Sequence, residues 1–314
     1  VGYQASYGSL YGNMTSIGYQ AAYTGGGGAE TAIGYQALYT AGSSSGGNTA
    51  IGHRSLYLNV SGTANVSVGH EALRSNTTAA GNTAVGFQAG YSNSTGASGT
   101  YIGYQAGYQT TAGGNSFFGI SAGYNVTTGT ANTYVGNSTG PNSGIASTGS
   151  YNTGVGQQAL QSVTTSIANT AVGYQAGYSS TTGGSLTAIG YQAARQNTTG
   201  DGNTAVGESA LYTNTSGSYN TAHGVGALKF NTNGAYNTAI GWQAAYNKGA
   251  GDALTAIGYQ AGYSNTGSSN TFIGAQAGYY VTSGAKNTIL GTYNGNQGGL
   301  DIRTANNYIV LSDG

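Results

Sequence analysis

The chain has 314 residues and few charges: seven Lys or Arg and seven Asp or Glu side chains make up 4% of the sequence. This composition offers no basic patch for nucleic acid, and the lack of cysteine excludes disulfides and thiolate metal sites. No apolar run reaches the roughly 18 residues of a membrane-spanning helix. Fifty-nine glycines with one proline and no Gly-X-Y period exclude collagen.

A short motif, Asn-Thr-Ala-(Ile/Val)-Gly, recurs along the whole chain. Its copies are 16 or 17 residues apart, except for one spacing of 18 and one of 20. Such regularity argues against disorder and indicates one structural unit per repeat, which is typical of a solenoid. The eighteen glycines that mark the copies are Gly2, Gly18, Gly34, Gly52, Gly69, Gly86, Gly103, Gly119, Gly136, Gly156, Gly173, Gly190, Gly207, Gly224, Gly241, Gly258, Gly274 and Gly291.

Each repeat reads Asn-Thr-Ala-(Ile/Val)-Gly-Tyr-Gln-Ala-(Leu/Gly)-Tyr, followed by about seven residues rich in Ser, Thr, Gly and Asn. A period of about 17 residues accommodates two short strands and two bends but is too short for a strand and a full helix. The β-branched residues before the glycine favour strands. We therefore predict an all-β protein, a parallel β-solenoid or β-roll with turns of about 17 residues.

Stacked turns place equal repeat positions in ladders of like side chains, and stacked amides and aromatic rings stabilise in-register strands. We count positions from the repeat glycine, which is expected in a bend closed to a β-carbon. The predicted structural ladders are Thr at −3 (Thr49, Thr83, Thr170), Ile or Val at −1 (Ile51, Val85, Val172), the glycine itself (Gly52, Gly86, Gly173), Gln at +2 (Gln36, Gln105, Gln175) and Tyr at +5 (Tyr39, Tyr108, Tyr178).

The strand has two uncharged faces. In Thr-Ala-Ile, Thr and Ile share one face and Ala takes the other. A single thin coil has only one interior, so the second face needs a partner. We infer self-association, with the small Ala positions allowing backbones to approach. Three chains around one axis, intertwined or side by side, are the natural closed solution; the sequence alone does not determine the number of subunits.

In chain order, we predict a repeat shaft over 1–295 and a cap or junction over 296–314. The chain starts in the middle of a repeat, so we expect more sequence upstream. A loop insertion is predicted near 137–152, where Asn137-Ser138-Thr139-Gly140-Pro141 replaces the usual Tyr-Gln-Ala-Gly-Tyr. The strand-like segment from Leu300 to Gly314 departs from the repeat, as terminal caps do.

Candidate chemistry is sparse. His53 and His70 occupy the same position in consecutive turns, so we expect a stack between Tyr35 and Phe87 and no metal site. Arg54 and Glu71 also share one position and are expected to form an ion pair across turns.

Catalysis needs converging groups, and the other titratable residues are scattered or isolated. No enzyme, metal or cofactor is predicted. Exposed Tyr, Gln and Asn could bind glycans by stacking and amide hydrogen bonds, but we favour structural ladders. The scattered or isolated residues are Glu30, Asp201, Glu208, His223 and Asp252.

The motif resembles the Asn-Ser-Val-Ala-Ile-Gly repeat of YadA-like trimeric adhesin heads, which are left-handed parallel β-rolls. The longer form with Gly-Tyr-Gln-Ala is similar to repeats in phage tail fibres. The tail from Asn306 to Gly314 resembles the segment ahead of an endosialidase-type intramolecular chaperone, which removes itself after trimerisation. The period here is longer than in the adhesin heads and Thr replaces Val. No catalytic residue of these families corresponds to a position of this chain.

The resemblance implies a structural and adhesive fibre: a homotrimeric tail-fibre shaft in a virion, with two further copies of itself and a host glycan or protein receptor as partners. It implies neither nucleic-acid binding nor membrane insertion. A bacterial trimeric autotransporter-type adhesin head or stalk at the cell surface is the alternative. An ice-binding β-solenoid, suggested by the Thr ladder, is more remote because the second outward rank is Ile or Val and not Thr. The receptor contacts, the receptor, the host and the handedness of the coil are not determined by the sequence.

Overall fold

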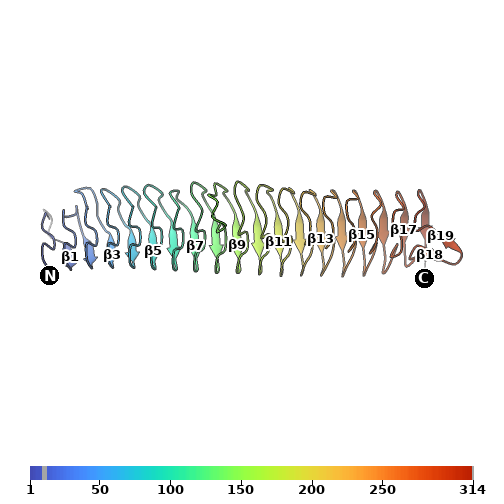
Figure 1. Ribbon diagram of the computed structural model, residues 1–314, viewed down its shortest axis with the longest axis horizontal. Helices are drawn as coiled ribbons and strands as arrows, with labels where there is room; N and C mark the ends of the chain where they lie inside the picture. The colour runs from blue at the N-terminus through green and yellow to red at the C-terminus, as the bar shows by residue number, and fades with distance from the viewer. Residues whose placement is uncertain (9–12, 313–314) are drawn as a thin grey trace. The chain divides into compact units, whose positions relative to one another are not determined.

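The computed structural model describes residues 1–8 and 13–312, and these residues contain strands and turns but no helix. The predicted fold class is confirmed, since the chain is a parallel β-solenoid of about 18 turns with a repeat of about 17 residues. The chain forms two compact units, Val1–Gln157 and Gln158–Gly314. Figure 1 shows the successive turns of each unit, with one short strand in nearly every turn.

In the first unit, nine strands pair in parallel in chain order, each with the strand of the next turn. They are β1 (Met14–Ile17), β2 (Glu30–Ile33), β3 (Thr49–Ile51), β4 (Val66–Val68), β5 (Thr83–Val85), β6 (Thr100–Ile102), β7 (Ser116–Phe118), β8 (Thr133–Val135) and β9 (Thr153–Val155).

In the second unit, eight strands pair in the same way. A ninth strand, β20, pairs in parallel with β17, and β18 and β19 form a separate antiparallel pair. The strands are β10 (Thr170–Val172), β11 (Thr187–Ile189), β12 (Thr204–Val206), β13 (Thr221–His223), β14 (Thr238–Ile240), β15 (Thr255–Ile257), β16 (Thr271–Ile273), β17 (Thr288–Leu290), β18 (Asn296–Gln297), β19 (Leu300–Asp301) and β20 (Ile309–Leu311).

Each regular turn contains one strand, whereas the sequence led us to expect two. The second half, Gly-Tyr-Gln-Ala-Leu, is not extended, because φ is positive at alternate residues: 134° at Gly34 and 52° at both Gln36 and Leu38. This alternation directs backbone N–H groups to both neighbouring turns. Gln36 donates to the carbonyl of Tyr19 in the preceding turn, and Leu38 to that of Ser55 in the following turn, both at 2.9 Å. The turn is thus hydrogen-bonded between turns without a second strand.

The stacking is in register. Thr83 pairs with Thr100 and Val85 with Ile102, so like residues lie above like residues. At the bend, a β-carbon on Gly52 would lie 2.4 Å from the carbonyl oxygen of Gly69. This contact and a φ of 131° explain why only glycine fits there.

The interior face of the strand is the small one. Ala50, Ala84 and Ala171, at position −2, are fully buried, while Val85 and Val172, at position −1, are 37% and 38% exposed. Our expectation that the Ala positions would allow backbones of a partner to approach is therefore wrong. Because Ala faces inward, the side chains from the opposite wall can reach it inside the thin coil.

Two alternative pairs of side chains fill the coil. Where Ala stands at −2, as at Ala50, a buried Leu at +4, here Leu56, can complete the turn. Where an aromatic ring stands at −2, position +4 is glycine: a β-carbon on Gly123 would lie 2.7 Å from the ring of Phe117, and one on Gly140 would lie 2.3 Å from Tyr134. The volume added at one position is thus removed at the other, which keeps the interior close-packed.

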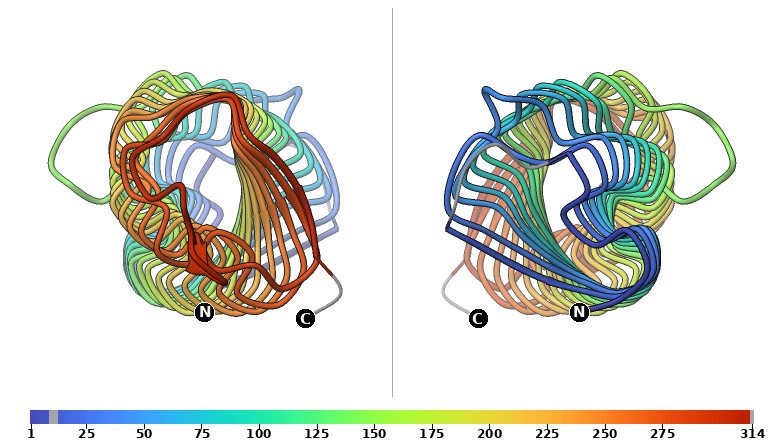
Figure 2. Two further views of the ribbon diagram at one scale, coloured as in Figure 1. Left: turned by 90° about the vertical axis from the view of Figure 1, so that its right-hand side faces the viewer. Right: turned by 90° about the vertical axis from the view of Figure 1, so that its left-hand side faces the viewer.

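Two segments depart from the regular turn. In the first unit, residues 143–146 of the predicted insertion are exposed, and Ile145 is 58% exposed. Figure 2 shows one green loop standing out from the regular turns.

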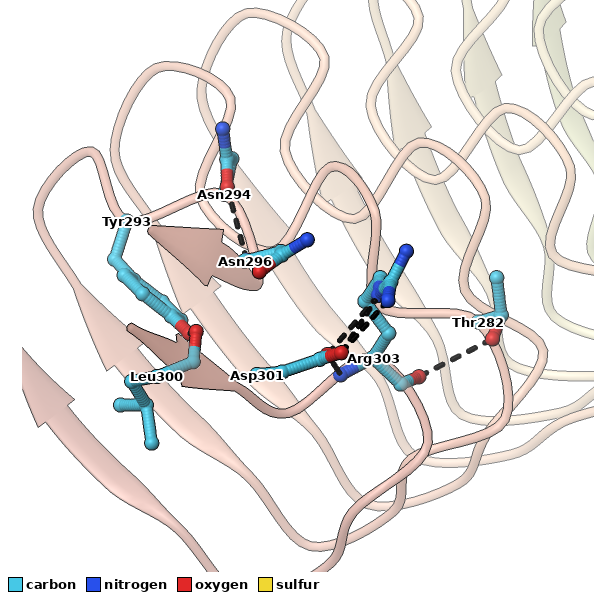
Figure 3. A network of polar contacts seen from close by, with 7 residues as sticks. All are labelled: Thr282, Tyr293, Asn294, Asn296, Leu300, Asp301 and Arg303. Atoms are coloured by element: carbon cyan, nitrogen blue, oxygen red, sulfur yellow. Dashed lines mark hydrogen bonds and ion pairs between the residues drawn. The ribbon is translucent and has the colours of Figure 1, made fainter. Parts of the chain in front are cut away.

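In the second unit, the segment predicted as a cap or junction contains the β18–β19 hairpin and then β20, and is described as far as Ser312. Tyr293 Oη donates to the carbonyl of Leu300 at 2.6 Å, Thr282 Oγ1 donates to that of Arg303 at 3.1 Å, and Arg303 pairs with Asp301 at 2.7 Å (Figure 3). These contacts tie the irregular segment to itself and to the turn before it.

Candidate functional surface

Three columns of side chains form a continuous exposed strip in each unit, which we call the strip. It consists of Thr at −3, Ile or Val at −1 and mainly aromatic residues at +1, the last two on either side of the repeat glycine. Several of its apolar side chains are about 40–50% exposed. Examples are Ile17, Tyr19, Tyr35 and Tyr104 in the first unit and Ile189, Tyr191, Ile240, Trp242 and Tyr259 in the second. Contiguous exposed apolar surface is a common feature of interaction sites in proteins.

The threonine hydroxyls of the strip are unused. Within the described residues, the hydroxyls of Thr49, Thr83 and Thr170 make no hydrogen bond. A second threonine ladder elsewhere on the turn behaves differently: Thr181, Thr198 and Thr215 each donate to a carbonyl of the next turn, at 2.8–3.1 Å. The strip therefore presents both apolar groups and free hydroxyls at the surface.

The aromatic column of the strip is stacked ring on ring. From Tyr3 through His53 and His70 to Tyr104, ring centroids are 4.7–5.4 Å apart and ring planes differ by at most 19°. Within this run the inner ring faces are covered by their neighbours, so the column presents ring edges there, and this geometry favours the structural over the glycan-binding interpretation of the run. In the second unit the column forms the separate pairs Tyr174–Tyr191 and Trp242–Tyr259.

The Gln and Tyr ladders link turns directly. Gln36 donates to Gln20 at 3.0 Å, Gln105 to Gln88 at 2.9 Å and Gln175 to Gln158 at 2.9 Å. At +5, Tyr39 stacks between Tyr23 and Tyr57, and Tyr108 between Tyr91 and Tyr124, at 5.0–5.1 Å. Tyr178 instead lies under the guanidinium of Arg195, 5.2 Å from its ring centroid.

Two buried asparagine ladders were not predicted from the sequence. At −4, Asn48 Oδ1 accepts the backbone N–H of Asn65 at 3.0 Å, and Asn65 Oδ1 accepts that of Asn82 at 2.9 Å. At +7, Asn214 donates to Asn197 at 2.7 Å and Asn231 to Asn214 at 2.9 Å. The signal was present, because the repeat motif itself begins with Asn, but the periodicity alone does not show that this amide faces inward.

Each asparagine ladder contains one charged substitute. Glu30 takes a −4 position and is 3% exposed; burial raises the pKa of its carboxyl, although hydrogen bonds from Asn48 and Ser45 oppose the shift. Lys248 takes a +7 position and is fully buried, and burial lowers its pKa to about 8. Neither group forms an ion pair within the described residues.

His53 and His70 lie as the repeat predicts. His53 and His70 stack at 4.7 Å between Tyr35 and Phe87. Burial, with smaller effects of His70 and Arg54, lowers the pKa of His53.

The predicted Arg54–Glu71 pair is not among the ion pairs of the described residues. Arg54 donates to Gln36 at 3.0 Å, and Glu71 pairs with Arg74 at 3.3 Å. Arg74 follows Glu71 by three residues in the same turn, and its guanidinium takes the place beside the Glu71 carboxylate that was predicted for Arg54.

No group of three or more His, Asp or Glu side chains arranged to hold a metal ion occurs in residues 1–8 and 13–312. His223 is an exposed member of the −1 column, and Asp201, Glu208 and Asp252 are also exposed. The described residues contain no helix long and apolar enough to cross a membrane. No protein-family model, curated protein or solved structure matches this chain.

Proposed function

We propose that this chain is a structural and adhesive fibre: a homotrimeric shaft segment of a phage tail fibre that carries host attachment, located in the virion. Its action is mechanical and involves no catalysis. The observation that carries the proposal is the strip, an exposed face of Ile or Val and aromatic side chains that is repeated turn after turn.

The structural role rests on the ladders. Regular turns are joined to their neighbours by strand pairing and, in many turns, also by buried asparagine amides and by stacked rings. A thin coil with this much exposed apolar surface gains stability by burying it, at about 25 cal/mol for each Å² removed from water. Three copies around an axis bury equivalent strips with closed symmetry. The Ile or Val column, and not the Ala column, is the face that meets the partner copies.

Light scattering tests the proposal on the chain expressed with and without its native downstream sequence. We expect about three times 31.2 kDa for the repeat segment, and a trimer only where the chain is expressed with the chaperone that the proposal places after it. A stable, soluble monomer in both preparations would refute the trimer.

A matched pair of variants then locates the interface. Ile102→Lys places a charge in the strip, where Ile102 is 37% exposed, and should weaken the trimer. Ile145→Lys places the same charge on the inserted loop, where Ile145 is 58% exposed, and should leave the trimer intact. If the two variants weaken the trimer equally, the strip is not the interface between the copies.

The strip suits a bacterial trimeric adhesin at the cell surface equally well. An upstream signal peptide and a C-terminal membrane anchor would indicate the adhesin, whereas a baseplate-attachment domain upstream and a chaperone downstream would indicate the phage fibre.

The free hydroxyls of the −3 threonines favour one further candidate, an ice-binding face. Thermal hysteresis of the purified chain would support it, and Thr83→Val should then reduce the hysteresis. The apolar column at −1, in place of a second threonine rank, makes this the weaker candidate.

A further inference from the structure

The second unit carries a surface depression of about 370 Å³ that lies outside the strip. Four consecutive turns line it with residues at positions −8, −6 and −5. It is hollow because glycine interrupts two columns: Gly184 stands between Ile167 and Asp201 at −6, and Gly202 stands between Ser185 and Tyr219 at −5. Its volume falls within the range of about 300–1,000 Å³ that is usual for small-ligand sites.

Asp201 supplies an anchored carboxylate. Its Oδ1 accepts the backbone N–H of Gly184 at 2.7 Å, and its own N–H donates to Ser218 Oγ at 3.0 Å. These bonds fix Asp201 to the two neighbouring turns and leave its Oδ2 free of hydrogen bonds within the described residues. Three hydroxyls around it, those of Thr165, Thr182 and Ser185, are also unpaired there. The depression therefore offers acceptors and weak donors at fixed positions.

The apolar walls are Tyr219 and Ile167, which are 57% and 53% exposed. One face of the Tyr219 ring stacks on Tyr236 at 5.4 Å, with the ring planes 16° apart. The other face is turned towards Gly202 and lies close to it along one edge, since a β-carbon there would be 2.8 Å from Tyr219 Cδ1, but no ring covers the rest of that face. Tyr219 thus differs from the inner rings of the strip, both of whose faces are stacked. An aromatic face beside a carboxylate and hydroxyls suits a molecule with C–H groups on one side and hydroxyls on the other.

We propose that this depression binds a neutral pyranose of a host surface glycan, with Asp201 accepting sugar hydroxyls and Tyr219 packing against the C–H face. The proposal deepens the proposed fibre function, on which it rests, by placing one receptor contact in this segment. The only charged side chain among the lining residues is the Asp201 carboxylate, which disfavours anionic sugars. The shallow, exposed setting suits a surface glycan better than an enclosed cofactor.

Saturation-transfer NMR on the assembled protein tests the site. The probes are the methyl glycosides of glucose, galactose, mannose, N-acetylglucosamine and rhamnose, each at millimolar concentration. We expect at least one to bind with its ring C–H protons in contact. Asp201→Asn keeps the acceptor for Gly184 but removes the charge, and should weaken binding about tenfold. Tyr219→Ala should abolish the contact of the ring C–H protons.

The chain offers matched controls. Asp252 makes the same two bonds as Asp201: its Oδ1 accepts the N–H of Ala235 at 2.7 Å, and its N–H donates to Ser268 Oγ at 3.1 Å. Asp252 does not line the depression. Tyr151 is 66% exposed and also has positive φ, but it lies in the first unit. Asp252→Asn and Tyr151→Ala should therefore retain full binding.

Three outcomes would overturn the proposal: no transfer to any glycoside, equal losses in the control variants, or binding of ethanolamine or Ca²⁺ at Asp201 without binding of a sugar. The solution mass of the same samples separates the two proposals. A trimer that binds no glycoside would refute the glycan site and leave the fibre proposal standing. A monomer that binds a glycoside would refute the trimeric fibre and leave the glycan site standing.

Discussion

Lys248 provides a sharp test of how the interior is built. It is the one lysine in the buried +7 asparagine column, and its Nζ donates to the carbonyl of Gly267 at 2.7 Å. In the two turns before Lys248, the amide of this column donates to the one before it: Asn214 to Asn197 and Asn231 to Asn214. Lys248 does not continue the series, and Asn231 Oδ1 is left buried without a partner. Lys248→Asn should restore the missing bond and remove a buried charge.

The magnitude follows from the pKa. A lowering from 10.5 to about 8 corresponds to about 3 kcal/mol, at about 1.4 kcal/mol per unit. The restored hydrogen bond adds about 1 kcal/mol. The folded protein loses the Lys248 proton near pH 8 and the unfolded chain only near 10.5, so the penalty is complete below pH 8 and disappears as the pH rises through 10.5. The advantage of the variant should fall from about 4 to about 1 kcal/mol.

Guanidinium unfolding of wild type and Lys248→Asn at pH 7, 9 and 10.5 measures this difference. Lys248→Met removes the charge without supplying the amide, and so separates the two contributions. Lys286→Asn changes an exposed lysine and should show no such dependence on pH. If Lys248→Asn gains nothing at pH 7, or if its gain is the same at all three pH values, the lysine is not held as a buried charge and the reasoning fails.

Three further predictions concern the interior and the insertion. Phe117→Ala should cost about 3–5 kcal/mol in guanidinium unfolding, and adding Gly123→Leu should recover most of it; no recovery would refute the volume exchange between −2 and +4. Because burial raises the pKa of Glu30 above 4.5, the folded state binds its proton more tightly, so stability should fall as pH rises above 4.5. Glu30→Gln should remove that fall in thermal unfolding between pH 4 and 8, whereas Glu208→Gln, at an exposed site, should not. Thermolysin should cut first before Ile145 at the exposed insertion, and a first cut within a regular turn would contradict the assigned loop.

Much of the fold could be predicted from the repeat. The spacing of the Asn-Thr-Ala-Ile-Gly copies predicts in-register turns, because a ladder needs equal positions one turn apart. The glycine at 52 could be predicted because no β-carbon fits beside the next turn. The insertion after Gly136 follows from the same count. The register, the repeat glycine and the position of the insertion each depend only on contacts between one turn and the next.

The surface chemistry could be predicted only in part. The His53–His70 stack follows from the register, but the partner of Glu71 does not, because Arg74 competes from within the same turn. The depression at Asp201 could not be predicted from the motif. It depends on Gly184 and Gly202 falling in adjacent columns of the variable arc, where the repeat imposes no residue type.

The sequence by itself determined the period, the register and the residue types that stack, since these depend on contacts between equal positions. Only the tertiary structure decided which face of Thr-Ala-Ile is inside, that Leu56 fills the space beside Ala50 while Gly123 makes room for Phe117, and that Lys248 is enclosed. The physical reason is that burial depends on the opposite wall of the coil. That wall is set by the path of the backbone between strands, where alternate positive φ values replace the expected second strand.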